Sequence, residues 1–422
     1  MNEAALSPTR RLYLADASVL EFEALVLAAE RNDAGSSIVL AESAFYPEAG
    51  GQLADQGTLA LDGRAPWSVV DVQIDDAGVV RHAVALDASA ELPQVGAVVR
   101  GRVEVSRRRE HSALHTAQHM LSRALLDEAG AATVSARLGA TACTIDLSLA
   151  EVSDAALARA EALVNAVIDD DRPIRAYFPE PAELAKLPLR REPKVTENVR
   201  VVDIDGFDVS PCGGTHATRT SQVHQAKLVG VERYKGKLRV SFTAGPRARR
   251  ELGHAFDTLS AIARRLTCGA DAIQATLDKA QRALQEERLV ARQHASELAT
   301  EKANALAATL APGSIASLDW PTASVEVLRV AAGHLVARQL VAVLAGAPTS
   351  GEQRAFVVAC PPNDPRDAGA LLRALATRAG GRGGGRKHHA EGTLPIACEL
   401  GALLASASEV LSVPGRTPPA EI

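Results

Sequence analysis

Two pairs of potential metal ligands, each spaced by four residues, constrain the fold of this chain most strongly. His115 and His119 occur in the motif HTAQH, inside a segment whose apolar residues recur with the period of an α-helix. At this spacing both imidazoles lie on one face of the helix. Cys212 and His216 follow much later in the motif CGGTH, where two glycines permit a tight backbone turn. A fold that joins the two motifs would assemble the nitrogen and sulfur ligands that zinc prefers.

Each motif alone also has a simpler interpretation. An isolated HxxxH pair is more often solvated or packed in a core than bound to metal, and an isolated CxxxH pair is a weaker signal. The presence of both motifs in one expected domain favours a shared metal ion. Glu110 does not create the HExxH motif, so the sequence excludes a zinc protease of that kind. His111 lies one helical turn before His115, and we interpret it as a neighbour of the site or a surface residue.

Hydrophobic patterning in the first half of the chain predicts two domains. Residues 1–104 predict a β-barrel-like domain, because short runs rich in Val, Ile and Leu alternate with turn clusters. Residues 105–248 predict an α+β zinc domain, with one helix over 107–130 that ends at Gly130 and another capped by Ser153. The expected fold class is therefore α+β and multidomain.

The second half predicts a helical connector over residues 249–314 and an α/β domain over residues 315–422. Gly269 is expected to break the connector, and leucines at multiples of seven support a coiled coil only weakly. The last domain is expected to alternate strands and helices. The expected order is a strand over 324–331, a helix over 334–346, a strand over 354–362, a helix over 367–380 and a helix over 394–411.

Composition limits the classes of protein further. A hydrophobic fraction of 47% excludes wholesale disorder, and 3% aromatic residues argue against a surface that binds bases mainly by stacking. The net charge of −5 divides unevenly, with −9 in residues 1–100 and +4 in residues 101–250, so RNA would follow the later, arginine-bearing part. Five scattered cysteines indicate a reducing compartment. We find no membrane-spanning run and no signal peptide, so we expect a cytoplasmic protein.

Two glycine-rich segments are further candidate binding elements. The loop FYPEAGGQ contains two glycines that let the backbone approach a ligand, although a plain turn is the alternative. The segment GGRGGGRKHHAEG combines glycines with cations and an expected helix start, which favours an anion-binding concavity over a flexible linker. It is not a Walker motif. Its expected contacts with a phosphate backbone are Arg382, Gly383, Gly384, Gly385, Arg386 and Lys387.

In this order, FYPEAGGQ, HTAQH, CGGTH and GGRGGGR resemble the editing half of the alanyl-tRNA synthetase family over about residues 12–410. Only about a dozen residues precede the β domain, where a synthetase has its aminoacylation module, so the chain is similar to free-standing AlaX-type editing proteins of the long form. The resemblance implies hydrolysis of mischarged Ser-tRNA(Ala) in trans, with Gly-tRNA(Ala) as a second candidate substrate. It implies one Zn²⁺ per chain, held by His115, His119, Cys212 and His216.

The resemblance also implies roles for residues around the zinc. A zinc-bound water is the expected nucleophile, although four protein ligands leave no vacant tetrahedral position unless the coordination expands or one ligand is loose. Its expected polar neighbours are Thr116, Gln118 and Thr215, which alternatively orient the imidazoles. The expected substrate contacts are Gly50, Gly51, Gln52, Ser135 and Thr144. The last two are included because a polar group that binds the serine hydroxyl would discriminate against alanine.

Two other classes of protein compete with the editing hydrolase. A non-catalytic tRNA- or RNA-binding protein with structural zinc is the main alternative. A DHH phosphoesterase, suggested by the C-terminal domain that these enzymes share, needs an aspartate-rich metal cluster, and none accompanies His388 and His389. The helical segment also suggests a homodimer formed through residues 249–422.

Overall fold

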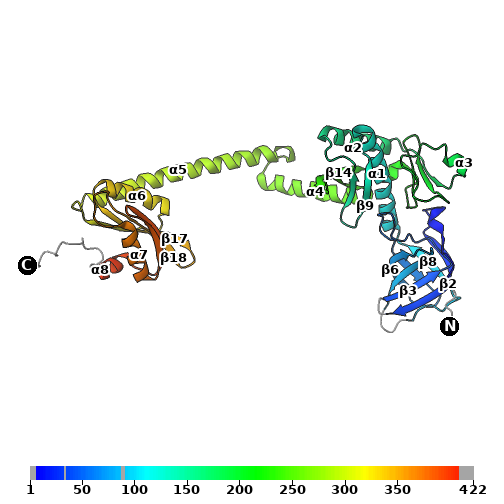
Figure 1. The fold of residues 1–422 in the computed structure, drawn as a ribbon, viewed down its shortest axis with the longest axis horizontal. Helices are drawn as coiled ribbons and strands as arrows, with labels where there is room; N and C mark the ends of the chain where they lie inside the picture. Colours follow the sequence, from blue (N-terminus) through cyan, green and yellow to red (C-terminus); the bar gives the residue numbers. More distant parts are fainter. Residues whose placement is uncertain (1–5, 33–34, 87–90, 408–422) are drawn as a thin grey trace, which may run out of the picture. The chain divides into compact units, whose positions relative to one another are not determined.

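In a computed structural model that describes residues 6–32, 35–86 and 91–407, the chain divides into two compact units (Figure 1). The first unit covers Met1–Ala261 and the second covers Ile262–Ile422. Buried apolar side chains form separate clusters within each unit, so each has a hydrophobic core of its own. None of the helices in the described ranges combines the length and the apolar character needed to cross a bilayer.

The first unit begins with a closed β-barrel, as the alternating pattern predicts. In β8 (Val98–Val103), Val99, Gly101 and Val103 point inward and are buried, while the residues between them are exposed. A side chain at Gly101 would overlap the ring of Phe22, so this glycine lets the aromatic ring fill the barrel. The other barrel strands, in spatial order, are β2 (Glu21–Asn32), β3 (Gly35–Leu40), β7 (Val80–Ala85), β6 (Trp67–Ile74) and β5 (Gly57–Ala60). In the chain, the short elements β1 (Arg10–Arg11) and η1 (Leu12–Leu14) precede β2, and β4 (Glu42–Ser43) follows β3.

A long helix, α1 (Val105–Ala129), joins the barrel to the α+β part of the unit. It ends at Gly130, whose left-handed backbone (φ 63°) forms the C-cap. Helix α2 (Asp154–Asp169) begins at Ser153, whose hydroxyl accepts a hydrogen bond from the Ala156 amide. Both helices pack on an antiparallel sheet ordered β14 (Ala226–Tyr234), β15 (Lys237–Ala244), β10 (Cys143–Leu147), β9 (Thr133–Leu138). A smaller sheet has the strand order β11 (Ile174–Tyr177), β12 (Val201–Ile204), β13 (Asp208–Pro211). The short helices α3 (Pro181–Leu184) and η2 (Thr220–Val223) follow β11 and β13 in the chain.

A buried ion pair fixes the start of α1 against the barrel. The Arg108 guanidinium donates to the Asp55 carboxylate, with Nη2 2.5 Å from Oδ2, and only 3% of the arginine side chain is exposed. The same guanidinium donates to the carbonyl oxygens of Ala17 and Ala44. Each of the three guanidinium nitrogens donates to an acceptor. These contacts hold α1 in one orientation relative to the barrel loop.

The second unit contains a mixed sheet covered on both faces. Helix α7 (Ala368–Ala379) and α8 (Leu400–Ser406) pack on one face, and α6 (Val325–Ala337) with the end of α5 (Ile273–Ala307) packs on the other (Figure 1). The sheet order is β16 (Ile315–Asp319), β17 (Val341–Ser350), β18 (Gln353–Ala359), β20 (His389–Pro395), β19 (Arg382–Arg386). Two helical elements, α4 (Gly245–Leu266) and η3 (Ala270–Ala272), precede α5 in the chain.

Several predictions for this last domain are wrong. Residues 324–331 begin helix α6 instead of forming a strand, because Ser324 caps the segment and Leu328, Ala331 and Leu335 line one helical face. The expected helix over 334–346 ends at Ala337, and its apolar second half begins the interior strand β17. The expected final helix over 394–411 is short within the described residues and starts only at Leu400.

The glycine-rich segment also differs from its prediction. It does not start a helix but forms β19, an edge strand paired antiparallel with β20. Side chains at Gly383 or Gly385 would overlap the β20 backbone, and at Gly383 also Leu372 of α7. The glycines therefore allow a helix and two strands to approach closely, which is a packing role.

Candidate metal centre

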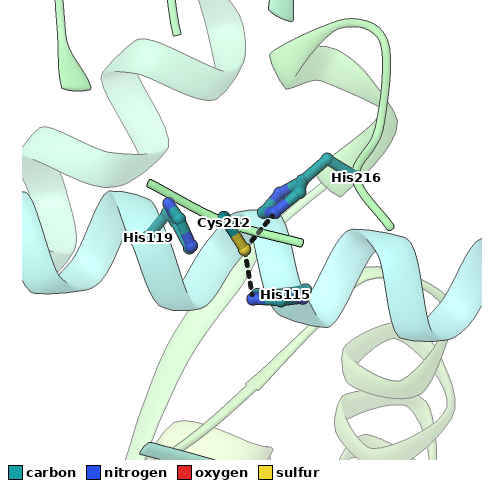
Figure 2. A group of neighbouring side chains, drawn as sticks. All are labelled: His115, His119, Cys212 and His216. Atoms are coloured by element: carbon teal, nitrogen blue, oxygen red, sulfur yellow. Dashed lines mark hydrogen bonds between the residues drawn. The ribbon is translucent and has the colours of Figure 1, made fainter. Parts of the chain in front are cut away.

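Four potential ligands meet between α1 and the loop that follows β13 (Figure 2). His115 and His119 project from one face of α1, and Cys212 and His216 come from the loop. Their ligand atoms all lie within 4.8 Å of one another. The Cys212 Sγ is 3.4 Å from His115 Nε2 and 3.3 Å from His216 Nε2. The two distant motifs therefore form one group, in the arrangement that their spacing predicts.

The spacing of these atoms fits a tetrahedral zinc ion. With Zn–N bonds of about 2.0–2.1 Å and a Zn–S bond of about 2.3 Å, a nitrogen and a sulfur ligand lie about 3.6 Å apart. The two sulfur–nitrogen distances are close to that value. Three imidazoles and one thiol are also the donor types that zinc selects. The donor types and these two distances thus fit a Zn²⁺ site.

Each imidazole has a polar group beside its outward nitrogen. His115 Nδ1 donates to Gln52 Oε1 at 2.7 Å, which leaves Nε2 free to act as a ligand. The hydroxyl of Thr116 lies 3.2 Å from His216 Nδ1, and Asp208 Oδ2 lies 3.4 Å from His119 Nδ1. These contacts favour the tautomers in which the inward nitrogens carry the lone pairs.

Gln52 supports the centre from the barrel loop instead of facing a substrate. It is fully buried, and its amide also donates to Thr215 Oγ1 at 2.8 Å and accepts from the Thr215 amide at 3.2 Å. Both ends of the side chain are therefore engaged within the protein. The neighbouring Gly51 has φ +87°, and a side chain there would lie 2.5 Å from the Ala136 carbonyl oxygen, so the loop needs glycine to lie against β9. Gly50 meets open space.

The CGGTH loop is also held tightly. A side chain at Gly214 would overlap the His115 ring, whereas Gly213 faces open space, so only Gly214 is sterically required. The buried guanidinium of Arg200 donates to the carbonyl oxygens of Cys212 and Gly214, each at 2.9 Å. The sequence gives no local signal for Arg200, because its partners are backbone atoms of a later loop.

The charges around the centre favour a thiolate. Burial alone would raise the pKa of the Cys212 thiol, but the neighbouring imidazoles lower it well below its ordinary value. Burial would also raise the pKa of Asp208, but the His119 imidazole and the Arg190 guanidinium lower it to about 2. Burial lowers the pKa of His216 to about 3, so this imidazole is neutral. Burial would lower the pKa of His119, but the charges of Cys212 and Asp208 raise it, so a metal ion would compete with a proton at this imidazole.

The centre lies beside a cavity of about 1100 Å³. His115, Cys212 and Gln118 line it together with Gly50 of the barrel loop and Ala136 of β9. Charged side chains also line it, and the cations outnumber the acidic Glu192 and Glu197. The cations are Arg11, Arg190, Arg191, Lys194 and Arg200. The volume is of the size that encloses small-molecule ligands, and the cations favour an anionic one.

Of the remaining expected site residues, some line the cavity and others are buried beside the ligands or lie elsewhere. Gln118 lines the cavity and donates to the Ser122 hydroxyl, while Thr116 and Thr215 are fully buried and contact His216 and Gln52. Ser135 lines the cavity, where its hydroxyl donates to Asp146. Thr144 lies on β10 and is not among the described residues that line the cavity.

His111 is not a member of the ligand group. Only 3% of this residue is exposed, so the interpretation as a surface residue is wrong. Its Nδ1 is buried and has no hydrogen-bond partner among the described residues. Burial and the charge of Arg107 lower the pKa of His111 to about 4, so its imidazole is neutral.

Comparisons with known proteins agree with these motifs. The domain described as "Threonyl and Alanyl tRNA synthetase second additional domain" matches residues 199–241. An alanine–tRNA ligase from Haloquadratum walsbyi is 32% identical over 419 residues, which cover 97% of this chain and 44% of the ligase. The chain thus spans less than half of that relative's length. The alanyl-tRNA editing protein AlaX-M from Methanosarcina acetivorans is 33% identical over 239 residues, which cover 54% of this chain and 95% of that protein.

One solved structure is also similar. The C-Ala domain from Aquifex aeolicus alanyl-tRNA synthetase matches 23% of this chain and 89% of its own length, with 22% identity and a TM-score of 0.21.

Proposed function

Since this chain belongs to the family of alanyl-tRNA synthetase editing domains and AlaX editing proteins, we propose that it hydrolyses the ester bond of mischarged tRNA(Ala). The proposed main substrate is Ser-tRNA(Ala), with Gly-tRNA(Ala) as the second, and the reaction takes place in trans on tRNA charged by another enzyme. The amino acid and the terminal adenosine would enter the cavity beside the four ligands.

The single observation that carries this proposal is the position of the ligand group. His115 and Cys212 line an open cavity of about 1100 Å³ instead of being sealed in the core. A purely structural zinc site has no need of such access. The cations that line the cavity offer contacts to the phosphates next to the esterified nucleotide.

In this proposal His115, His119, Cys212 and His216 hold one Zn²⁺. When bound, the ion supplies Lewis-acid polarisation of the ester carbonyl and makes water a stronger nucleophile. Thr116 orients His216 through its hydroxyl, and Gln118 presents an amide at the cavity wall. Thr215 and Gln52 keep the His115 ring in place.

Selection of serine needs a polar group in the cavity that alanine would leave unpaired. Of the two hydroxyls expected for this role, we retain Ser135, because it lines the cavity. Thr144 is dropped because it does not line the cavity. The Ser135 hydroxyl donates its proton to Asp146, so the Ser135 Oγ remains available as an acceptor for the substrate hydroxyl.

Two further proposals concern the second unit. Strand β19 carries Arg382 and Arg386 along an exposed sheet edge, and exposed Lys387 follows in the next turn. We assign to this edge a contact with the tRNA backbone. Helix α5 exposes Leu277 and Leu284, which are 40% and 47% accessible and one heptad apart. This apolar stripe supports the proposed homodimer through residues 249–422.

A second candidate function is a non-catalytic tRNA-binding protein with structural zinc. The observation in its favour is the complete set of four protein ligands, which leaves a tetrahedral ion no open position. The two functions differ in one respect: blocking the cavity should stop deacylation by an editing hydrolase, whereas a binding protein has no such activity to lose. Ala136→Trp would place an indole ring in the cavity without removing a metal ligand.

The deciding experiment measures deacylation of Ser-, Gly- and Ala-tRNA(Ala) supplied in trans to the purified protein, with bound zinc determined in parallel. We expect rapid loss of the seryl ester, strong reduction in Cys212→Ala and Ala136→Trp, and retention of zinc only in the latter. Cys268→Ala is the matched control, because it removes a thiol of the second unit. A zinc-loaded protein that leaves Ser-tRNA(Ala) at its spontaneous rate would support the binding protein instead.

A further inference from the structure

A second cavity in the first unit, of about 620 Å³, lies on the other side of the ligand loop. The first cavity touches the loop at Cys212, Gly213 and Gly214, whereas the second touches it at His216, Ala217 and Thr218. Its other walls come from the residues before β2, the start of α1, the η2 turn and the start of α4.

Positive charge dominates this second cavity. Arg108, Arg109 and Arg249 line it, and the described residues that line it include no Asp or Glu. Arg108 is neutralised by Asp55 in the buried ion pair. Arg109 and Arg249 are exposed, and within the described part of the chain neither makes a hydrogen bond or an ion pair. Two like charges thus face one cavity without a counter-charge.

Arg109 differs from the two arginines before it, because both of those have partners within the protein. Arg107, Arg108 and Arg109 are consecutive on α1. Arg107 donates to the Ala54 carbonyl oxygen at 2.8 Å, and Arg108 pairs with Asp55. Only the third arginine is left for a ligand.

The start of α4 repeats this arrangement. Arg247 and Arg250 share the Glu110 carboxylate, with Arg247 Nε 3.0 Å from Oε1. Arg249, between them, has no partner in the described residues and lines the cavity beside Pro246. The first turn of α4 contains no acidic residue, although acids are favoured there. Both arginine clusters therefore leave one guanidinium unpaired, and both of these guanidiniums line the same cavity.

Size and wall chemistry indicate the class of ligand. The cavity has room for a phosphate together with an adjoining sugar, and the described lining residues include no Phe, Tyr or Trp on which a base could stack. Arginine forks match the oxygens of a phosphate. His224 adds a ring nitrogen donor, held at the cavity by a tight turn in which the Gln225 amide donates to the Val223 carbonyl oxygen at 2.7 Å.

We propose that Arg109 and Arg249 bind a backbone phosphate of tRNA in this second cavity, an inference that rests on the proposed function. The esterified nucleotide would enter the first cavity, so the phosphate in the second belongs to a different part of the RNA, on the opposite side of the Cys212–His216 loop. The contact reads the sugar–phosphate backbone and carries no base specificity.

The test measures the affinity of uncharged tRNA(Ala) over a series of salt concentrations, with the full chain and with inorganic phosphate as a separate ligand. Arg109→Ala and Arg249→Ala should each weaken tRNA binding about tenfold at low salt. Each should also lower the salt slope by about 0.7 to 0.9. The charge-retaining variant Arg249→Lys should keep the slope, which separates lost charge from misfolding.

Arg100→Ala combined with Arg102→Ala is the matched control, because it removes two exposed arginines of the barrel strand β8 and the same net charge. An Arg109/Arg249 double variant that binds tRNA with the affinity and salt slope of this control would overturn the proposal. Phosphate binding that depends on both arginines, with tRNA affinity unchanged, would also overturn it in favour of a small-anion site. A protein that binds tRNA through both arginines but deacylates nothing would refute the proposed function alone.

Discussion

Replacing Gln52 with leucine should weaken the metal centre without removing a ligand. The Gln52 side chain makes three hydrogen bonds, to His115 Nδ1 at 2.7 Å, to the Thr215 amide at 3.2 Å and to Thr215 Oγ1 at 2.8 Å. Leucine has a similar size but offers no acceptor. The His115 Nδ1–H and the Thr215 N–H would then be buried without partners.

The magnitude follows from those two donors. A buried donor without an acceptor costs about 1–3 kcal/mol, so the pair predicts a loss of about 2–6 kcal/mol in the free energy of unfolding of the first unit. Removing the group that orients a zinc-ligating histidine lowers metal affinity about 10- to 100-fold. Gln52→Glu keeps an acceptor for both donors, and the Thr215 hydroxyl can turn to donate, so this variant should retain most of the affinity.

The assay uses the two tryptophans of the chain. Trp67 is buried in the barrel and Trp320 lies in the second unit, so Trp320→Phe leaves fluorescence that reports on the first unit. Urea unfolding then gives stability, and competition with a zinc chelator gives affinity. Gln56→Leu is the matched control, because its amide makes one exposed hydrogen bond to the Val70 carbonyl oxygen. Wild-type affinity and stability in Gln52→Leu would refute the proposed support of His115.

Three further predictions concern the first unit. Arg108→Met should lower its unfolding free energy by about 3–5 kcal/mol in urea, because Asp55 would stay buried without its cation. Burial lowers the pKa of His82 to about 4, below the unfolded value of about 6.5, so protons bind the unfolded chain preferentially and stability should fall by up to about 3 kcal/mol between pH 6.5 and 4. His82→Gln should remove that part of the pH dependence in the same urea titrations. Zinc chelation should lower the unfolding midpoint followed by Trp67 and leave that followed by Trp320 unchanged.

Each of these has a contrary outcome. Arg100→Met removes an exposed ion pair and should cost less than about 1 kcal/mol, so equal effects at Arg100 and Arg108 would contradict the ion-pair argument. A His82→Gln variant as acid-sensitive as the wild type would show that other groups cause the acid loss. A chelator effect seen equally by both tryptophans would place the metal outside the first unit.

The local part of the metal centre could be predicted from the sequence. The four-residue spacing sets His115 and His119 on one helical face, and Gly130 and Ser153 form the caps that their residue types predict. These features depend on neighbours in the chain, so pattern and residue type suffice.

The supporting contacts could not be predicted in the same way. Gln52 reaches His115 from 63 residues earlier in the sequence, and Asp208 approaches His119 from a different strand. Such partners are set by tertiary packing, and the residue types alone are also typical of loops and surfaces. Arg200 contacts backbone carbonyl oxygens, which leave no trace in side-chain patterns.

Errors in the second unit have a different cause. The run from Leu340 to Ala345 is continuously apolar, so its periodicity cannot distinguish a buried strand from a buried helix. This run forms strand β17 because it pairs with β16 on one side and β18 on the other. The sequence predicts a helix start in the glycine-rich segment, but the segment forms a strand. Its glycines are needed because α7 and β20 lie too close to leave room for side chains.

The junction between the barrel and α1 also restricts how this molecule can be recombined. Gln52 and Asp55 lie three residues apart in one barrel loop, and their partners His115 and Arg108 lie two turns apart on α1. A genetic crossover between loop and helix would separate both pairs at once. The products would bury an imidazole N–H and a carboxylate beside unmatched neighbours. Loop and helix are therefore inherited as one block, and a viable chimera has to carry both from the same parent.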